Sequence, residues 1–353
     1  MAQDVGAHVA LGRGGFADDT APAGALVALL DGSGEWVVGE SLAEARRLSG
    51  KVQGRRTTAP LRSPIELPPG AWMRTLQTNW VEPAYLEPDA AWCEPGGVPA
   101  SSLGNGGAFG GKVATEVGVV ARRLADRHGR AVRVLFTRED VVRRGPKRPP
   151  IAAGVRADGT GVVRVARTPG IVEAIGSVAP GLAVEEVDVI GPPTTSAARA
   201  AGWAEAAVLL ASIADTAIDT GIDTGIDMAI DTVTAPNGAT ASASIDPDGS
   251  VRVRVRCGDP LDPVVLRSYC TGAAHMALGW VRSEGLAIGD DGTPLDLTIR
   301  SFGVLRAVDT PPIQVVIEPD DGEPVNGSDA VYAAVTAAAW RHAGFPPEWP
   351  TAR

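Results

Sequence analysis

The sequence predicts an α+β fold, in which helices pack against mixed sheets. Strand-like and helix-like patterns alternate irregularly along the 353 residues, which is typical of this class. Apolar residues make up 44% of the chain and charged residues 21%, which is ordinary for a globular protein. The chain also holds 43 glycines and 28 prolines, so frequent turns are expected between the elements.

The N-terminal part predicts a loose arm followed by strands and a helix. Residues 1–25 lack periodicity and are expected to form the arm. Apolar runs between residues 26 and 38 predict two strands. Ser41 and Glu44 have the spacing of a capping box, and Gly50 suits a helix end, so a helix is expected between them.

Further elements follow from apolar spacing. A helix from Val113 to His128 is predicted because its valines and Leu124 recur on one helical face. Strands are expected at 132–136, at 251–255 and on both sides of the turn at Asp158. Two more helices are expected at 264–285 and 329–343, the last capped by Ser328 and stopped by Gly344.

Three segments organise the chain beyond its N-terminal arm. Residues 26–215 are expected to form a first domain, which carries a glycine-rich loop at 104–112. Residues 216–240 contain an Ile-Asp-Thr-Gly repeat, too short for a solenoid core, and predict a low-complexity linker. Residues 241–353 are expected to form a second domain.

Charge and cysteine usage exclude several classes of function. The 42 acidic residues outnumber the 32 basic ones, so binding to nucleic acid or to an anionic membrane is disfavoured. Cys93, Cys257 and Cys270 form no Cys-x-x-Cys pair, so neither a metal cluster nor a disulfide framework is expected. With no signal peptide or membrane-spanning run, a cytoplasmic protein is predicted.

The glycine-rich loop from Gly106 to Lys112 allows three interpretations. Its spacing fits a phosphate-binding P-loop, but Val113 stands where a hydroxyl would bind Mg²⁺. A dinucleotide fingerprint fails because Phe109 replaces the third glycine. A purely structural turn that leads into a helix is the plainest alternative.

The loop also resembles one family. The sequence Gly-Gly-Ala-Phe-Gly-Gly-Lys at 106–112 is similar to that of the molybdenum hydroxylases of the xanthine dehydrogenase/aldehyde oxidase family, in their molybdopterin-binding large subunit. Further segments, one before the loop and the others after it, resemble family segments in the same order along the chain. They are the Glu-Pro segment at 81–91, Arg199 to Gly202, residues 246–279, residues 302–312 and the C-terminal Pro-Thr-Ala-Arg.

The resemblance implies a reduced version of that subunit and a molybdenum–molybdopterin cofactor. It implies an oxidoreductase subunit that hydroxylates a small molecule, an aldehyde or an N-heterocycle, with oxygen derived from water. Partners would be iron–sulfur and FAD-binding subunits, since the chain has no site of its own for either carrier. Arg199 would face substrate and Glu323 would be the general base; no protein side chain would ligate the metal. The residues beside the cofactor would be Gly106, Gly107, Phe109, Gly110, Gly111, Gly272 and Ala273.

Departures from the family leave a second hypothesis open. Tyr269 replaces a family glutamine, and the stretch near 215–240 is much shorter than its family counterpart. Glu323 lies two residues out of register, and the other register places Ser328 at the base position beside Asp329. The alternative is therefore a catalytically degenerate subunit, either structural or completing the pocket of a longer molybdopterin-binding paralogue.

Overall fold

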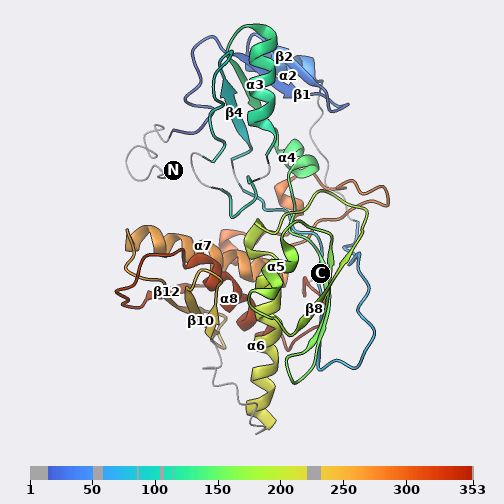
Figure 1. Cartoon of the computed structure of the whole chain (residues 1–353), viewed down its shortest axis with the longest axis vertical. Helices are drawn as coiled ribbons and strands as arrows, with labels where there is room; N and C mark the ends of the chain where they lie inside the picture. Colours follow the sequence, from blue (N-terminus) through green and yellow to red (C-terminus); the bar gives the residue numbers. More distant parts are fainter. Residues whose placement is uncertain are drawn as a thin grey trace.

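Three four-stranded sheets and the helices packed on them build the molecule. The computed structural model describes residues 15–50, 59–85, 87–103, 107–113, 115–220 and 232–351. One sheet lies at the top of Figure 1, and the other two lie below it on either side of the long helix α6 (Trp203–Thr220). The expectation of mixed sheets with packed helices is confirmed at this level.

Sheet one carries the strands predicted near the N-terminus. Its order is β2-β1-β5-β4, with β1 parallel to β5 and the other neighbours antiparallel. Helix α2 (Leu42–Ser49) and helix α3 (Val117–His128) pack on it. The strands are β1 (Leu26–Leu30), β2 (Trp36–Gly39), β4 (Ala90–Cys93) and β5 (Val132–Leu135).

The ends of these helices test the sequence patterns. The Ser41 side chain accepts a hydrogen bond from the Glu44 amide, and Gly50 ends α2 with a left-handed φ of 59°, as predicted. Helix α3 begins at Val117, so the prediction of a helix from Val113 is wrong at its start. The chain up to Val113 is held in turns, and the Val113 side chain is exposed.

Sheet two has the order β3-β6-β7-β8. Its first three strands are antiparallel neighbours, while β7 and β8 are parallel and joined through helix α5 (Ile171–Gly176). Strand β3 belongs to this sheet although it precedes β4 and β5 of sheet one, and helix α4 (Arg138–Arg144) leads the chain back. The strands are β3 (Arg74–Gln77), β6 (Ile151–Val155), β7 (Gly161–Ala166) and β8 (Leu182–Val187).

Sheet three packs against two helices of small residues. Its order is β12-β11-β10-β9, and it carries α7 (Pro263–Arg282) and α8 (Ser328–His342). Helix α8 is buried from Ala330 to Trp340 because its alanines let α6, α7 and sheet three approach on all sides. The strands are β9 (Thr232–Thr234), β10 (Thr240–Ile245), β11 (Val251–Arg256) and β12 (Ile313–Ile317).

The predicted domain boundaries remain predictions. The range 26–215 contains the strands of sheets one and two, and 241–353 contains most of sheet three. The range expected as a linker, 216–240, includes the end of α6 and all of β9. Residues 1–14 of the expected arm and residues 221–231 of the repeat lie outside the described residues.

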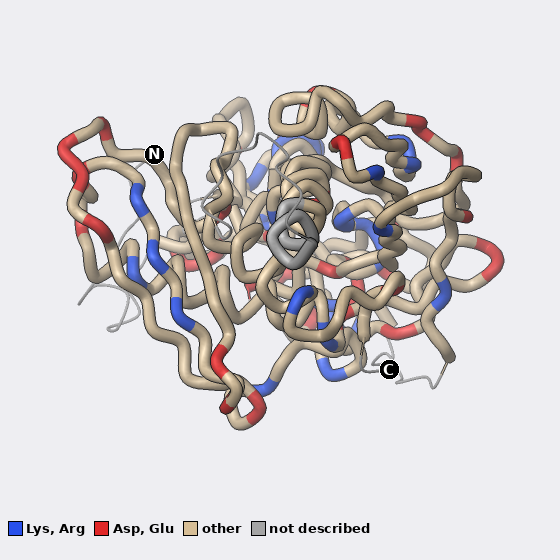
Figure 2. The backbone as a smooth tube through the Cα atoms, turned by 90° about the horizontal axis from the view of Figure 1, so that it is seen from below, with Lys and Arg blue, Asp and Glu red and all other residues tan. Residues whose placement is uncertain are grey.

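Acidic and basic residues are scattered along the chain, with acidic ones at several turns (Figure 2). The exposed arginines of β11 each pair with an acidic side chain; the pairs are Arg252–Asp246, Arg254–Glu318 and Arg256–Asp320. Such exposed pairs contribute little to stability. Among the described helices, none combines the length and the apolar character that a membrane span requires.

Candidate functional site

The glycine loop meets a second bent segment from a distant part of the chain. Ala108 and Phe109 both have left-handed backbone conformations, with φ of 51° and 50°. Arg199 and Ala200 share this conformation, with φ of 49° and 58°. Residues other than glycine rarely adopt it, and strained backbone of this kind is concentrated at functional sites. Two strained bends therefore face each other at one place.

Backbone contacts lock the two bends together. The Arg199 amide donates a hydrogen bond to the Phe109 carbonyl at 2.7 Å. A Cβ atom on Gly110 would overlap the carbonyl of Ala197, and one on Gly111 would lie 2.8 Å from Pro83. Glycine is required at both positions because other parts of the chain occupy the space of a side chain.

Several loop amides are already used inside the loop. The amides of Gly111, Lys112 and Val113 donate to carbonyls of Ala108, Gly107 and Gly110, at 3.0, 3.2 and 3.3 Å. These three amides are therefore not offered to an anion. Gly106, expected beside the cofactor, lies outside the described residues.

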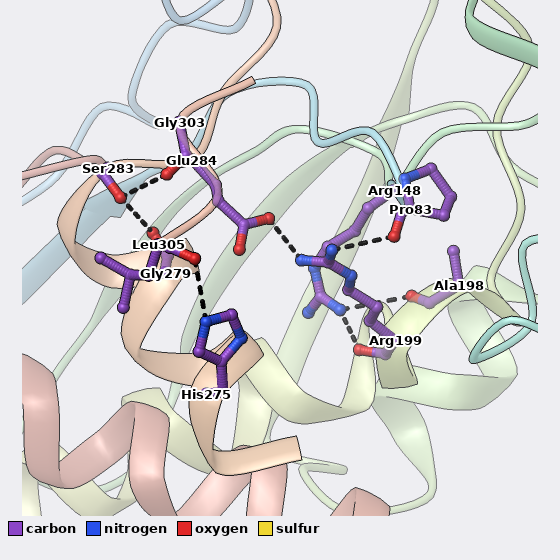
Figure 3. A network of polar contacts seen from close by, with 10 residues as sticks. All are labelled: Pro83, Arg148, Ala198, Arg199, His275, Gly279, Ser283, Glu284, Gly303 and Leu305. Carbon is purple, nitrogen blue, oxygen red and sulfur yellow. Dashed lines mark hydrogen bonds and ion pairs between the residues drawn. The ribbon is translucent and has the colours of Figure 1, made fainter. Parts of the chain in front are cut away.

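The Arg199 side chain is buried and paired in the interior (Figure 3), although its Nε atom has no hydrogen-bond partner among the described residues. Its guanidinium pairs with Glu284 at 2.6 Å and donates to the carbonyl of Pro83 at 3.0 Å. Only 3% of Arg199 and 2% of Glu284 is exposed. Burial, the largest single effect, lowers the pKa of Arg199, but Glu284 together with Tyr332 and Glu82 outweighs it and raises the pKa overall, so the guanidinium stays charged. A contact with substrate through this group stays a prediction.

Two more buried ion pairs lie near the place where the Phe109 and Arg199 bends meet, which we call the joint. Arg148 pairs with Glu205 at 2.6 Å, and its guanidinium donates to the carbonyls of Ala198, at 3.3 Å, and of Arg199. The same guanidinium lies 3.8 Å from the ring centroid of Trp280. Arg148 therefore stabilises the bend at Arg199 through backbone carbonyls, while its guanidinium packs on Trp280 of α7.

The second pair joins Lys147 and Glu82 at 2.9 Å, with neither side chain exposed. Burial lowers the pKa of Lys147, and the charge of Glu82 partly offsets this. Sequence reasoning missed all three pairs because their members are distant in the chain. The adjacent Lys147 and Arg148, directly before two prolines and an apolar strand, were the available signal.

Helix α7 brings its predicted residues to the loop. A Cβ atom on Gly272 would meet only the ring edge of Phe109, at 4.0 Å. Gly107 is similarly open, since a Cβ atom there would have its nearest neighbours at 4.0 Å. Ala273, the next predicted residue, is buried in α7. Phe109, Gly107 and Gly272 thus form a partly open face beside the locked bends.

The two candidate carboxylates occupy different environments. Glu323 is exposed in the loop between β12 and α8, and its carbonyl lies against Gly258. Asp329 is half-buried in the first turn of α8. Burial raises the pKa of Asp329, against smaller lowering effects from the Ser328 hydrogen bond and the charge of Arg148. A carboxyl group with a shifted pKa, such as Asp329, is more typical of a functional site than an exposed carboxylate such as Glu323.

The described residues fit a pocket wall better than a complete cofactor cradle. Three loop amides and the Arg199 guanidinium are bound within the protein. Glycines at 110 and 111 serve contacts between chain segments. No group of three or more His, Cys, Asp or Glu side chains in the described ranges could hold a metal ion. Among the described residues of the loop and of α7, the face at Gly107, Phe109 and Gly272 is the part left for an external group.

Comparisons with known proteins agree with the fold. The chain resembles quinoline 2-oxidoreductase from Pseudomonas putida 86 with a TM-score of 0.58 and 10% identity, over 79% of this chain and 74% of that one. Reconstituted CO dehydrogenase from Oligotropha carboxidovorans gives a TM-score of 0.54 at 10% identity, over 76% and 72% of the two chains. A Cu,Mo-CO dehydrogenase in its carbon monoxide reduced state gives 0.53 at 10% identity, over 76% and 73%.

The likeness is one of fold. No family model matches the sequence, and no curated protein sequence is similar to it. At 10% identity, the solved structures establish a shared architecture, so the resemblance to molybdenum hydroxylases is supported at the level of the fold.

Proposed function

We propose that this chain is a non-catalytic subunit of a molybdenum hydroxylase-type oxidoreductase, a reduced relative that completes a pocket in a longer, molybdopterin-bearing partner. The observation that carries the proposal is the locked joint at Phe109 and Arg199. The chain keeps the architecture of such enzymes, but protein groups satisfy the amides and the guanidinium that cofactor and substrate would need.

The open face at Gly107, Phe109 and Gly272 is the part offered to the partner. A half-buried aromatic ring beside two glycines lets another chain approach closely. The iron–sulfur and FAD-binding subunits would then assemble on the longer partner. The cytoplasm, expected as the compartment, belongs to the same proposal; Cys93, Cys257 and Cys270 are buried free thiols in keeping with it.

A second candidate is that the chain is itself the hydroxylating enzyme. The strained backbone at Ala108, Phe109, Arg199 and Ala200 favours it, because strain persists where function requires it. Bound molybdopterin would supply the oxidative hydroxylation of an aldehyde or N-heterocycle. In this chain, Gly107, Phe109 and Gly272 would line its site, and Glu323 or Asp329 would hold the proton.

Metal analysis separates the two candidates. The protein is purified alone and with the subunits encoded beside its gene, and molybdenum and pterin are measured by mass spectrometry. We expect neither in the chain alone and both in the complex with a longer subunit. Stoichiometric molybdenum in the chain alone contradicts the first candidate and supports the second. If no complex forms, the pocket-completing role is wrong.

A matched pair of variants tests the face itself. Phe109→Ala removes the aromatic ring from the proposed contact and is expected to weaken assembly at least about tenfold, as an interface anchor does. Val172→Ala, at an exposed position of α5, serves as the control and leaves assembly unchanged. Equal affinities for the two variants contradict the proposed face.

A further inference from the structure

A cavity of about 380 Å³ lies beside sheet one and helix α4. Its wall includes Asp89 directly before β4, Thr115 two residues before α3, and Phe136 directly after β5. Arg143 and Arg144, in the last turn of α4, also line it, together with Glu116, Gly145 and Pro193. The volume is within the range of small-molecule sites.

Two oxygen atoms in this wall lack hydrogen-bond partners among the described residues. Asp89 is 1% exposed, and its Oδ1 accepts a hydrogen bond from the Tyr85 hydroxyl at 2.7 Å. Its Oδ2 is buried and has no partner, and neither does the buried Oγ1 of Thr115. A buried polar atom left unsatisfied costs about 1–3 kcal/mol. Two of them beside one cavity indicate an occupant that donates hydrogen bonds.

The Tyr85 hydroxyl keeps its proton and remains a donor. Burial raises its pKa far above the ordinary range, and the charge of Asp89 adds to this. Tyr85 therefore binds one oxygen of the Asp89 carboxylate and leaves the other for the occupant. A carboxylate oxygen and a hydroxyl together suit an ammonium group, which carries three donors and a positive charge.

The cavity wall also carries basic side chains. Arg144 pairs with Glu116 at 2.7 Å and is thereby neutralised. Arg143 is exposed, and the structure describes no partner for its guanidinium. The Phe136 ring forms an apolar side wall, held by stacking on Trp36 with centroids 5.9 Å apart. The cavity therefore offers an acid at its buried end, an aromatic side and a base at its rim.

We propose that this cavity binds a small zwitterion, an amino acid or related amino carboxylate. Its ammonium group donates hydrogen bonds to Asp89 and Thr115, and its carboxylate pairs with Arg143. The methylene chain between them lies along Phe136. This site is independent of the proposed subunit role, since it uses neither Phe109 nor Arg199.

A series of probes of increasing length tests the proposal by isothermal titration calorimetry. The probes are glycine, β-alanine, 4-aminobutanoate and 5-aminopentanoate, with butylamine and butanoate as compounds that carry one charge only. We expect one length to bind best, and both singly charged compounds to bind at least about tenfold more weakly, the loss of one ion-paired hydrogen bond. No binding by any amino acid of the series at millimolar concentration overturns the proposal.

Variants of Asp89 and Arg143 test which residue binds the ammonium group and which binds the carboxylate of the ligand. Asp89→Asn and Arg143→Gln should each weaken the best probe at least about tenfold. Arg123→Gln, at an exposed position of α3, is the matched control and leaves affinity unchanged. Because Arg143 is exposed, its variant remains folded even where Asp89→Asn does not. Unchanged affinity in Arg143→Gln contradicts the proposed orientation, and ordered water alone between Asp89 and Thr115 in crystals grown with the probe contradicts the site.

Discussion

Gly110 stands so close to Ala197 that the carbonyl of Ala197 occupies the place of a Gly110 side chain. The backbone of Gly110 also has a left-handed φ of 87°. Gly110 therefore permits both the turn of its own loop and the close approach of the segment at Ala197, which is distant in the sequence. Any side chain at this position must separate the two bends.

Gly110→Ala should lower the free energy of unfolding by at least about 3 kcal/mol, because it adds overpacking against backbone to an unfavourable φ. Gly129→Ala is the matched control, since Gly129 also has a left-handed φ, of 65°, but a Cβ atom there meets nothing within 4 Å. It should cost only about 1–2 kcal/mol. Urea denaturation gives both values; equal losses contradict the close contact.

Removing one partner of the buried pair of Arg199 and Glu284 should cost about 3–5 kcal/mol, because the remaining charge is left without a partner in the interior. Arg199→Met and Glu284→Leu test this in thermal and urea unfolding. The double variant should be less destabilised than the sum of the two, since it leaves no unpaired charge. Additive losses contradict a direct pairing. Arg306→Ala, in an exposed pair, should change stability little.

Replacing Asp329 by asparagine should increase the stability of the protein by an amount that depends on pH. Burial raises its pKa above the ordinary value of 3.8, so the folded state binds this proton more readily than the unfolded state. The resulting penalty is absent below pH 3.8 and fully present above the folded-state pKa. Asp329→Asn should therefore raise the free energy of unfolding at pH 7, with a gain that shrinks as the pH falls toward 3.8.

Asp309→Asn is a control of opposite sign for this measurement. The hydrogen bond from Arg306 lowers the pKa of Asp309 below its ordinary value of 3.8. The Asp309 carboxylate therefore stabilises the folded state above pH 3.8, and this stabilisation is lost as the pH falls below that value. Urea unfolding from below pH 3.8 up to pH 7 should therefore show the gain of Asp329→Asn growing as the pH rises above 3.8, whereas the loss of Asp309→Asn is constant above 3.8 and shrinks only below it. A gain for Asp329→Asn that does not change with pH contradicts the titration of Asp329.

Glu323→Gln distinguishes the two candidate functions by turnover. Glu323 is exposed and lies outside the joint, so under the subunit role its substitution leaves the activity and molybdenum content of the complex unchanged. Loss of a positioned general base costs about two to four powers of ten in rate. Steady-state assays of the assembled complex decide, and a loss of that size with normal molybdenum content would restore Glu323 as the base.

Local sequence patterns predicted α2, α3, α7, α8 and about half of the strands, because their signals are carried by neighbours in the chain. Ser41, Glu44 and Gly50 delimit α2 through contacts within one or two turns. The start of α3 was misplaced because the valine spacing continues back to Val113, while the loop before it is held by turns. Periodicity cannot register such tertiary competition.

The sequence also predicted part of the candidate site, namely the two segments that carry a local pattern. The glycine loop and the Arg199 segment stand out in the sequence, and the structure brings them together. Their mutual locking depends on Glu284, Glu205 and Arg148, which come from separate elements and carry no local pattern. Only the fold reveals that the conspicuous arginine is paired inside the protein.

The path of the chain through its sheets restricts how such a protein can change. Strand β3 joins sheet two before β4 and β5 return to sheet one, so no single cut frees either sheet as an intact piece. Recombination that replaced one of them would have to exchange two separate segments of the gene. The passage from α6 to β9 is different, since all strands of sheets one and two precede it and all strands of sheet three follow it. Insertions and deletions at that point leave every strand pairing intact, which makes it the natural place for the length of this protein to vary.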